Sequence, residues 1–406
     1  MSGQSPLSMM RTARRPQGRQ RSEPRRRWRP WRFLVLAVLI VALPIGWTML
    51  WSYAASIANQ ALSGWIDREA AIGRVYACGS QTVGGFPFAI TIRCDNAAGA
   101  FSSNRPPVDV SAKNISFSSQ VFHPTLLNGE VSSPVTLADP GKSPTFVANW
   151  SRARLALLGM PGEPQRVTVE FAKPRLDHSL GDNNLGPNAG MVFQADSLKV
   201  DGRIIEGSAR HNPVIEASGQ WTAALAPNFH PLFAEPLQGE IDAVMRGFRD
   251  FSPKPWPVLF RELQASGGGI AIKSLRIART DAALTGTGSF TVNAQGRLDG
   301  ELRVKVAGVE NIVPLLGVDQ LIGQGVDRLT GGAGAPAQGL GMLDRLLPGL
   351  GGAVREGANA GLIESIKKMG EPTQLDGKPA VTLSLRVTDG IVYVGIIPVA
   401  AVPALF

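Results

Sequence analysis

The pattern of apolar and polar positions divides the chain into one long apolar segment and a much longer region of alternating positions. Residues 33–51 read FLVLAVLIVALPIGWTMLW, without a charged side chain. A helix rises about 1.5 Å per residue, so this segment covers roughly the 30 Å of a bilayer's hydrocarbon core. Tryptophans lie at both of its ends, as in the aromatic belts of membrane interfaces: Trp28 and Trp31 at one end, Trp47 and Trp51 at the other. The pattern predicts a transmembrane helix over 33–51 that continues as helix to about residue 67.

From residue 73 onward, apolar positions alternate with polar ones, which is typical of strands with one wet face. In the segment 297–306, for example, Leu302, Val304 and Val306 alternate with charged residues. Fully buried parallel strands would be apolar throughout. The pattern therefore predicts a mainly β domain over 73–406, built as a large curved antiparallel sheet or sheets with a few short helices. A weak likeness between residues 190–222 and 270–307 raises the hypothesis of two similar β units.

Two further segments stand out near the C-terminus. Residues 350–369 have the periodicity of a helix that ends at Gly370. Residues 323–341 are rich in glycine and hold no lysine, which indicates a flexible linker or a loop that contacts another surface. The tail 391–406 is almost wholly apolar and is broken by two prolines. It is too short to span a bilayer and either closes the core or lines a groove.

The distribution of charge predicts the orientation of the apolar segment in the membrane. The first 32 residues hold ten arginines against one glutamate, which accounts for the whole net charge of +9. The rest is neutral, so a nucleic-acid partner is not expected. The positive-inside rule predicts that residues 1–32 form a disordered cytoplasmic arm, close to anionic phospholipid, and that the bulk is exported. A cleaved signal peptide, cut near Ala54 and Ala55 or after Ala58, is the alternative, although signal peptides usually have a shorter apolar run.

The two cysteines and four histidines are candidates for a disulfide, a metal site or a catalytic site. Cys78 and Cys94 form an even pair in an exported domain, without a C-x-x-C spacing or a nearby histidine, which favours a disulfide over a metal pair or a redox dithiol. No histidine has a ligand or catalytic spacing. The loop with Asp177, His178 and residues 182–184 could hold a cation through its oxygens, but a polar surface loop explains it more simply. No catalytic residue, metal or cofactor is predicted, and the protein is not expected to be an enzyme.

A curved sheet with an unfilled apolar face would form a groove for a hydrophobic ligand. Eight positions in the C-terminal strands and the tail are the candidates for its lining: Phe290, Val292, Leu302, Val304, Val306, Leu383, Leu385 and Tyr393. Core packing is the alternative for these residues.

Two stretches resemble a known family. The segment 65–94, with Trp65, GGFPF at 84–88 and the two cysteines, is similar to the start of the domain of unknown function 2125 family, and 389–406 is similar to its end. The resemblance implies an alphaproteobacterial envelope protein anchored in the inner membrane, with its bulk in the periplasm and no assigned activity. A remoter resemblance, carried by the glycine-rich turns in 265–302, is to AsmA-like envelope proteins, and implies a groove-forming sheet and a part in lipid traffic.

Three functions are therefore compared. The first is lipid binding or handling in maintenance of the cell envelope, with inner-membrane phospholipid as the partner. The second is a scaffold that binds other envelope proteins through sheet edges or the 323–341 loop. The third, an enzyme, requires a cluster of polar residues in one cleft, and no spacing indicates one.

Overall fold

The computed structural model describes residues 30–102, 106–179, 190–251, 254–315, 360–361 and 363–406. The chain forms two units, Met1–Tyr53 and Ala54–Phe406. Helix α1 (Pro30–Ala71) is longer at both ends than predicted, so residues 30–32 belong to the helix rather than to the arm. From Trp31 it is long and apolar enough to cross a membrane, which suggests a membrane anchor. The rest of the arm, including Trp28, lies outside the described residues.

The second unit is mainly a large antiparallel sheet, as predicted. Its strands are β1 (Arg74–Gly84), β2 (Ala89–Phe101), β3 (Val108–Gln120), β4 (His123–Val131), β5 (Val135–Ala138), β6 (Pro144–Asn149), β7 (Arg152–Leu158), β8 (Arg166–Ala172), β9 (Arg175–His178), β10 (Met191–Gln194), β11 (Ser197–Ser208), β12 (His211–Ala224), β13 (Leu237–Arg246), β14 (Gly269–Ala278), β15 (Ala283–Val292), β16 (Leu298–Ala307), β17 (Glu371–Leu375), β18 (Lys378–Thr388), β19 (Ile391–Val394) and β20 (Ile397–Ala401).

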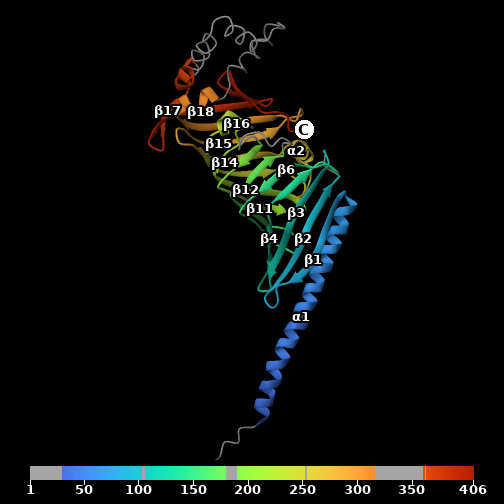
Figure 1. The fold of residues 1–406 in the computed structure, drawn as a ribbon. Coiled ribbons are helices and arrows are strands. Elements are labelled where there is room, and N and C mark those ends of the chain that lie inside the picture. Colours follow the sequence, from blue (N-terminus) through green and yellow to red (C-terminus); the bar gives the residue numbers. More distant parts are fainter. Residues whose placement is uncertain (1–29, 103–105, 180–189, 252–253, 316–359, 362) are drawn as a thin grey trace, which may run out of the picture. The chain divides into compact units, whose positions relative to one another are not determined.

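The strands pair in one continuous order, β1–β2–β3–β4–β7–β8–β11–β12–β13–β14–β15–β16–β18–β19–β20. A branch runs from β3 through β5, β6 and β9 to β10, and β17 pairs with β18. In Figure 1 this order can be followed along a twisted sheet, from β1 and β2 past β11 and β12 to β16 and β18. All these pairings are antiparallel, as alternation with one wet face predicts.

Four pairs of consecutive strands are halves of longer strands. β4 and β5, β6 and β7, β8 and β9, and β10 and β11 are separated by only two or three residues each. Backbone hydrogen bonds continue across these positions: Lys173 N donates to Asp196 O at 2.8 Å, and Ala195 N to Pro174 O at 3.0 Å. Proline lacks an N–H group and Lys173 has a φ of 51°, so the regular ladder is interrupted here. Together the interruptions form a break line across the sheet, at which the branch begins.

Asp-Gly turns set the register of the last strands. Asp376-Gly377 joins β17 to β18, and Asp389-Gly390 joins β18 to β19, and all four residues have φ between 52° and 75°. Positive φ at both central residues defines the type I′ turn, whose twist matches that of the flanking strands. The register therefore follows from the turn: Leu375 pairs with Lys378, and Thr388 with Ile391.

Two clusters of buried apolar side chains form the core, and both draw on β12 and later elements. The first joins β16, β18 and β19 to α3 (Val309–Ile312), η2 (Val313–Leu315) and Ile366. The second joins α2 (Trp256–Ala265) to Phe248, Ile215 and Val292. Leu405 and Phe406 pack against this second cluster. The tail therefore closes the core, which is the first of the two roles predicted for it.

Other predictions are met only in part within the described residues. Of the helix predicted over 350–369, residues 360–361 and 363–369 are helical, and the chain leaves the helix at Gly370 as expected. Residues 350–359 and the glycine-rich segment 323–341 lie outside the described residues. The duplication of a β unit stays a prediction.

Cys78 and Cys94 form a disulfide that links β1 to β2, with their Cα atoms 5.6 Å apart. The bridge connects the strand next to α1 to the interior of the sheet, because β1 pairs with β2 alone among the described strands. It therefore ties the outermost strand to the rest of the second unit.

Replacing both cysteines by serine should lower the free energy of unfolding by about 3 kcal/mol, because a bridge that closes a loop of this length restricts the unfolded chain. Urea unfolding of the full chain in detergent, followed by tryptophan fluorescence, measures the difference. The parent protein treated with a reductant is the control and should move to the same midpoint. Equal midpoints for the oxidised and reduced parent would contradict the prediction.

Candidate functional site

One face of the sheet carries an unbroken line of apolar residues from the first strand to the last long one. Residues paired across adjacent strands lie on the same face, with Cβ atoms about 5 Å apart. Each position of the line pairs with the next: Val83, Ile92, Phe117, Gly129, Leu155, Val169, Val200, Gly219, Ile241, Leu275, Gly286, Val304 and Leu383. Every member is aliphatic, aromatic or glycine, and we call this surface the apolar face.

The opposite face is polar along the same path. One residue further along each strand, the paired positions are Thr82, Arg93, Ser116, Glu130, Arg154, Glu170, Lys199, Gln220, Glu240, Arg276, Thr285, Lys305 and Thr382. Charges of opposite sign are often neighbours, as in the Lys199–Glu170 ion pair at 2.7 Å. The two faces of the sheet therefore differ in polarity over its whole length, and the polar face is expected to contact water.

The apolar face is covered unevenly. At its C-terminal end Val304 is 1% exposed and Leu383 is also buried, because α3, η2 and Ile366 pack over them. In the middle of the line, Val200 on β11 is 46% exposed. Among the described residues, both core clusters draw their members from β12 onward, so the part of the apolar face on β1 to β11 contributes to neither cluster.

Small residues make the open part of this face shallow. Gly202 on β11 pairs with Val167 and Ala217, and Ala217 pairs with Ala243. A Cβ atom built on Gly202 would have none of the described atoms within 4 Å, which shows open space above this position. By contrast, a Cβ on Gly239 would overlap the Trp221 ring and lie 2.8 Å from the Arg276 carbonyl oxygen. The face is thus hollow at Gly202 and filled at Gly239.

A pocket of about 330 Å³ opens on the apolar face beside Trp221. Leu198 and Trp221 pair across β11 and β12 and form its floor. Phe193 comes from β10, and the remaining lining comes from the end of β12 and the connection that includes η1 (Pro231–Phe233). The full lining is apolar: Phe193, Leu198, Trp221, Ala224, Leu225, Ala226, Phe229 and Phe233. Phe229 is 81% exposed at the mouth of the pocket, so its ring is accessible to a ligand that enters.

The eight predicted lining residues occupy different places. Four are buried in the core clusters (Val292, Val304, Val306 and Leu383), and Leu302 and Leu385 pack against them. Phe290 lies on the apolar face, paired with Ile270 and Gly300. Tyr393 pairs with Arg386 and therefore lies on the polar face. Six of the eight thus belong to the core or pack against it, because helices, Ile366 and the chain end fill the C-terminal part of the face.

The open positions were missed, although the sequence carries a signal for them. Leu198, Val200, Gly202 and Ile204 alternate with Lys199, Asp201 and Arg203 as strictly as any predicted strand. What alternation does not reveal is which strands are covered by other elements. The place of Trp221 above Gly239 depends on the pairing of β12 with β13 and is not visible in either segment alone.

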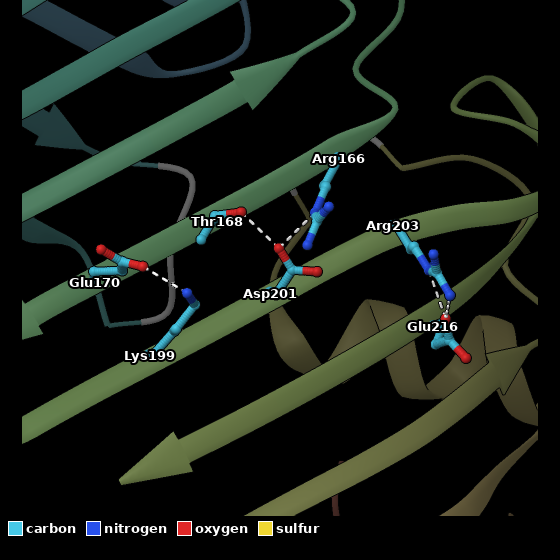
Figure 2. A network of polar contacts seen from close by, with 7 residues as sticks. All are labelled: Arg166, Thr168, Glu170, Lys199, Asp201, Arg203 and Glu216. Atoms are coloured by element: carbon cyan, nitrogen blue, oxygen red, sulfur yellow. Dashed lines mark hydrogen bonds and ion pairs between the residues drawn. The ribbon is translucent and has the colours of Figure 1, made fainter.

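On the polar face, a network of hydrogen bonds and ion pairs joins neighbouring strands (Figure 2). Asp201 is buried and accepts hydrogen bonds from Arg166 Nε at 2.8 Å and Thr168 Oγ1 at 2.5 Å. Burial acts to raise the pKa of this carboxyl, but the bonds from Arg166 and Thr168 outweigh it, and the pKa is lowered. Beside it, Lys273 and Arg203 both bind Glu216 and lower the pKa of that carboxyl. The network is a set of matched charges and joins β8, β11, β12 and β14.

The histidines do not come together in a metal or catalytic site within the described residues. No group of three or more His, Cys, Asp or Glu side chains there could hold a metal ion. His178 lies on β9 with its ring edge-on to Phe146, at 4.9 Å between centroids. Residues 182–184, the other part of the candidate cation loop, lie outside the described residues.

Comparison with known protein families gives a match over most of the chain. The model of a family described as "uncharacterized protein conserved in bacteria" (DUF2125) matches residues 51–403. No curated protein and no solved structure matches the chain. The resemblance to AsmA-like proteins therefore gains no support from these comparisons and stays a prediction.

Gly239→Ala should destabilise the protein by about 1 to 3 kcal/mol, because the new methyl group has to displace the Trp221 ring or the backbone of β14. Gly202→Ala, on the same face, is the matched control and should change stability by less than about 1 kcal/mol, since the space there is open. Urea unfolding of both variants tests the contrast. Equal losses would mean that the face is as tightly filled at Gly202 as at Gly239.

Asp201→Asn should cost about 1.5 to 3 kcal/mol at pH 7, since the folded state then loses charged hydrogen bonds. The lowered pKa means that this stabilisation is present above the unfolded carboxyl's pKa and is lost as pH falls through the folded value. The difference between parent and variant should therefore shrink in acid. Glu170→Gln, at an exposed ion pair on the same face, is the control and should cost well under about 1 kcal/mol. A difference independent of pH would contradict the assignment.

Proposed function

This chain belongs to the DUF2125 family of uncharacterized proteins conserved in bacteria. The family description names no activity, so we propose a function from the geometry of the second unit. The protein is a single-pass inner-membrane protein whose β domain lies in the periplasm. It holds the acyl chains of lipids against the open part of the apolar face, in maintenance of the cell envelope. The role is one of binding and handling, without an enzymatic step.

The observation that carries this proposal is the unbroken apolar line together with its uneven cover. A sheet of this kind normally buries its apolar face against another layer, because exposed apolar surface is costly at roughly 25 cal/mol per Å². Here the described layers over that face gather on β12 and later strands. A hydrocarbon chain laid over Val200 and Gly202 would supply the missing contacts, and the pocket beside Trp221 is large enough to receive part of it.

Two features support the proposed periplasmic location of the β domain: the charge of the N-terminus and the disulfide. The arginine-rich N-terminus is retained in the cytoplasm by the positive-inside rule, so the chain after α1 is exported. The Cys78–Cys94 disulfide fits an oxidising compartment such as the periplasm. Bacterial phospholipid is then the abundant hydrophobic ligand within reach of an anchored domain.

A scaffold that binds envelope proteins is the second candidate. It is favoured by the C-terminal edge of the sheet, where Ile396 is 91% exposed in the turn between β19 and β20. A partner strand or loop docking there would cover it, as partners do at exposed edge strands. This role uses a different part of the molecule and does not require an open apolar face.

A photoreactive residue at Val200 in cells should crosslink to phospholipid, because this position lies in the middle of the open apolar face. The matched control is Gln220, an exposed position on the polar face of the neighbouring strand, which should give no lipid adduct. Mass spectrometry of the irradiated, purified full chain identifies the adducts. Protein adducts alone at Val200 would favour the scaffold, and no adduct at either position would contradict lipid binding on this face.

A further inference from the structure

Three phenylalanines project from two neighbouring hairpin tips at one end of the sheet. Phe86 and Phe88 lie in the turn between β1 and β2, and Phe122 lies in the turn between β3 and β4. Phe88 is 60% exposed, Phe122 is 68% exposed and Phe86 is also exposed. The rings of Phe88 and Phe122 have centroids 6.0 Å apart, so they form one surface. We call these residues the aromatic tips.

The two tips are held together by the backbone rather than by chance contact of side chains. Val121 N donates to Phe88 O at 2.9 Å, and Ala89 pairs with Gln120 at the start of the β2–β3 ladder. The turns themselves, residues 84–90 and 120–124, contain no Asp, Glu, Lys or Arg. A rigid, uncharged surface of aromatic rings fits an apolar or interfacial partner better than a polar protein surface.

The direction of β1 along the helix places these tips at a particular end of the second unit. Near the start of β1, Arg74 forms an ion pair with Glu69, and the Tyr76 ring packs against Trp65 at a tilt of 32°, with centroids 4.9 Å apart. Further along, Gln81 donates a hydrogen bond to Asn59. The strand therefore runs back along the helix, toward lower helix numbers, as its own numbers rise.

The aromatic tips then lie at the end of the second unit at which its part of α1 begins. From Gln81 to Phe86 the strand and turn advance up to about 16 Å, at roughly 3.3 Å per residue. From Asn59 back to Ala54 the helix covers only about 7.5 Å. Ala54 is where the chain joins the apolar segment predicted to cross the membrane. The tips thus occupy the end of the domain to which the membrane span is attached.

We infer that the aromatic tips dock on the outer surface of the phospholipid bilayer that α1 crosses, with Phe88 and Phe122 inserted at the level of the headgroups and upper acyl chains. The inference rests on the membrane anchoring in the proposed function but not on a lipid held by the domain. It would bring the β1–β4 end of the apolar face to the membrane surface. That is the end at which a lipid leaving the bilayer could first meet Ile92 and Phe117.

The other exposed aromatics do not share this arrangement. Phe229 belongs to the mouth of the pocket already described, and Trp256 on α2 stacks on Phe260, close to the second core cluster. Trp256 is as exposed as Phe122, so it serves as a control for exposure of an aromatic ring without the placement.

The test uses the full chain reconstituted in phospholipid vesicles, with a photoreactive phenylalanine at position 88, 122 or 256. Lipid adducts at 88 and 122 should exceed those at 256 by on the order of tenfold, the factor that corresponds to 1.4 kcal/mol for partial burial of a phenylalanine side chain. Each variant is checked for an unchanged unfolding midpoint, as expected at exposed positions. Equal yields at all three positions, or no lipid adduct at 88 and 122, would overturn the inference.

The same vesicles separate this inference from the proposed function. Adducts at 88 and 122 without adducts at Val200 would support docking and contradict lipid binding on the apolar face. Adducts at Val200 without adducts at the tips would overturn the docking while the proposed function stands. A vesicle made with a lipid that quenches fluorescence in its acyl chains, used with Phe122→Trp, gives a second measure: stronger quenching than for the parent supports insertion, and unchanged quenching contradicts it.

Discussion

The structure of the second unit depends on the register in which its strands pair. Side chains alternate between the two faces of a strand, so a slip of one residue at any pairing would move a whole strand's apolar set to water. From Val83 on β1 to Leu383 on β18, the pairings keep apolar residues opposite apolar residues and polar opposite polar. Two features protect that register: Asp-Gly turns, which fix where β17, β18 and β19 meet, and matched charges on the polar face such as those around Asp201.

A sheet this long has more apolar surface than its own helices cover. The C-terminal part is a conventional core, in which α2, α3, Ile366 and the chain end fill the face until Val304 is almost fully buried. Toward the N-terminus the described cover is thinner, and glycine and alanine leave open space around Gly202. The difference between these two parts is the physical basis for assigning a ligand to the open part.

Much of the fold could be predicted from the sequence because alternation is a local property. The apolar helix, the antiparallel strands and their two faces follow from residues a few positions apart, and the cysteine pair follows from composition. Which residues of the apolar face stay exposed could not be predicted, because this depends on the elements that pack over them. Val304 and Val200 look alike in sequence, yet one lies under helices and the other is 46% exposed. The position of Tyr393 opposite Arg386 could not be predicted for another reason. Residues 391–394 are all apolar and show no alternation, so only the turn at Asp389-Gly390 sets Tyr393 opposite Arg386.

The central claim is that the open part of the apolar face holds lipid, and native mass spectrometry tests it most directly. The full chain, released from mild detergent, should carry phospholipid that a charge at Val200 removes, while the same charge at Gln220 on the polar face leaves it bound. Lipid held only around the anchor would respond to neither change. A parent protein free of lipid, or equal lipid loads in Val200→Glu and Gln220→Glu, would contradict the account.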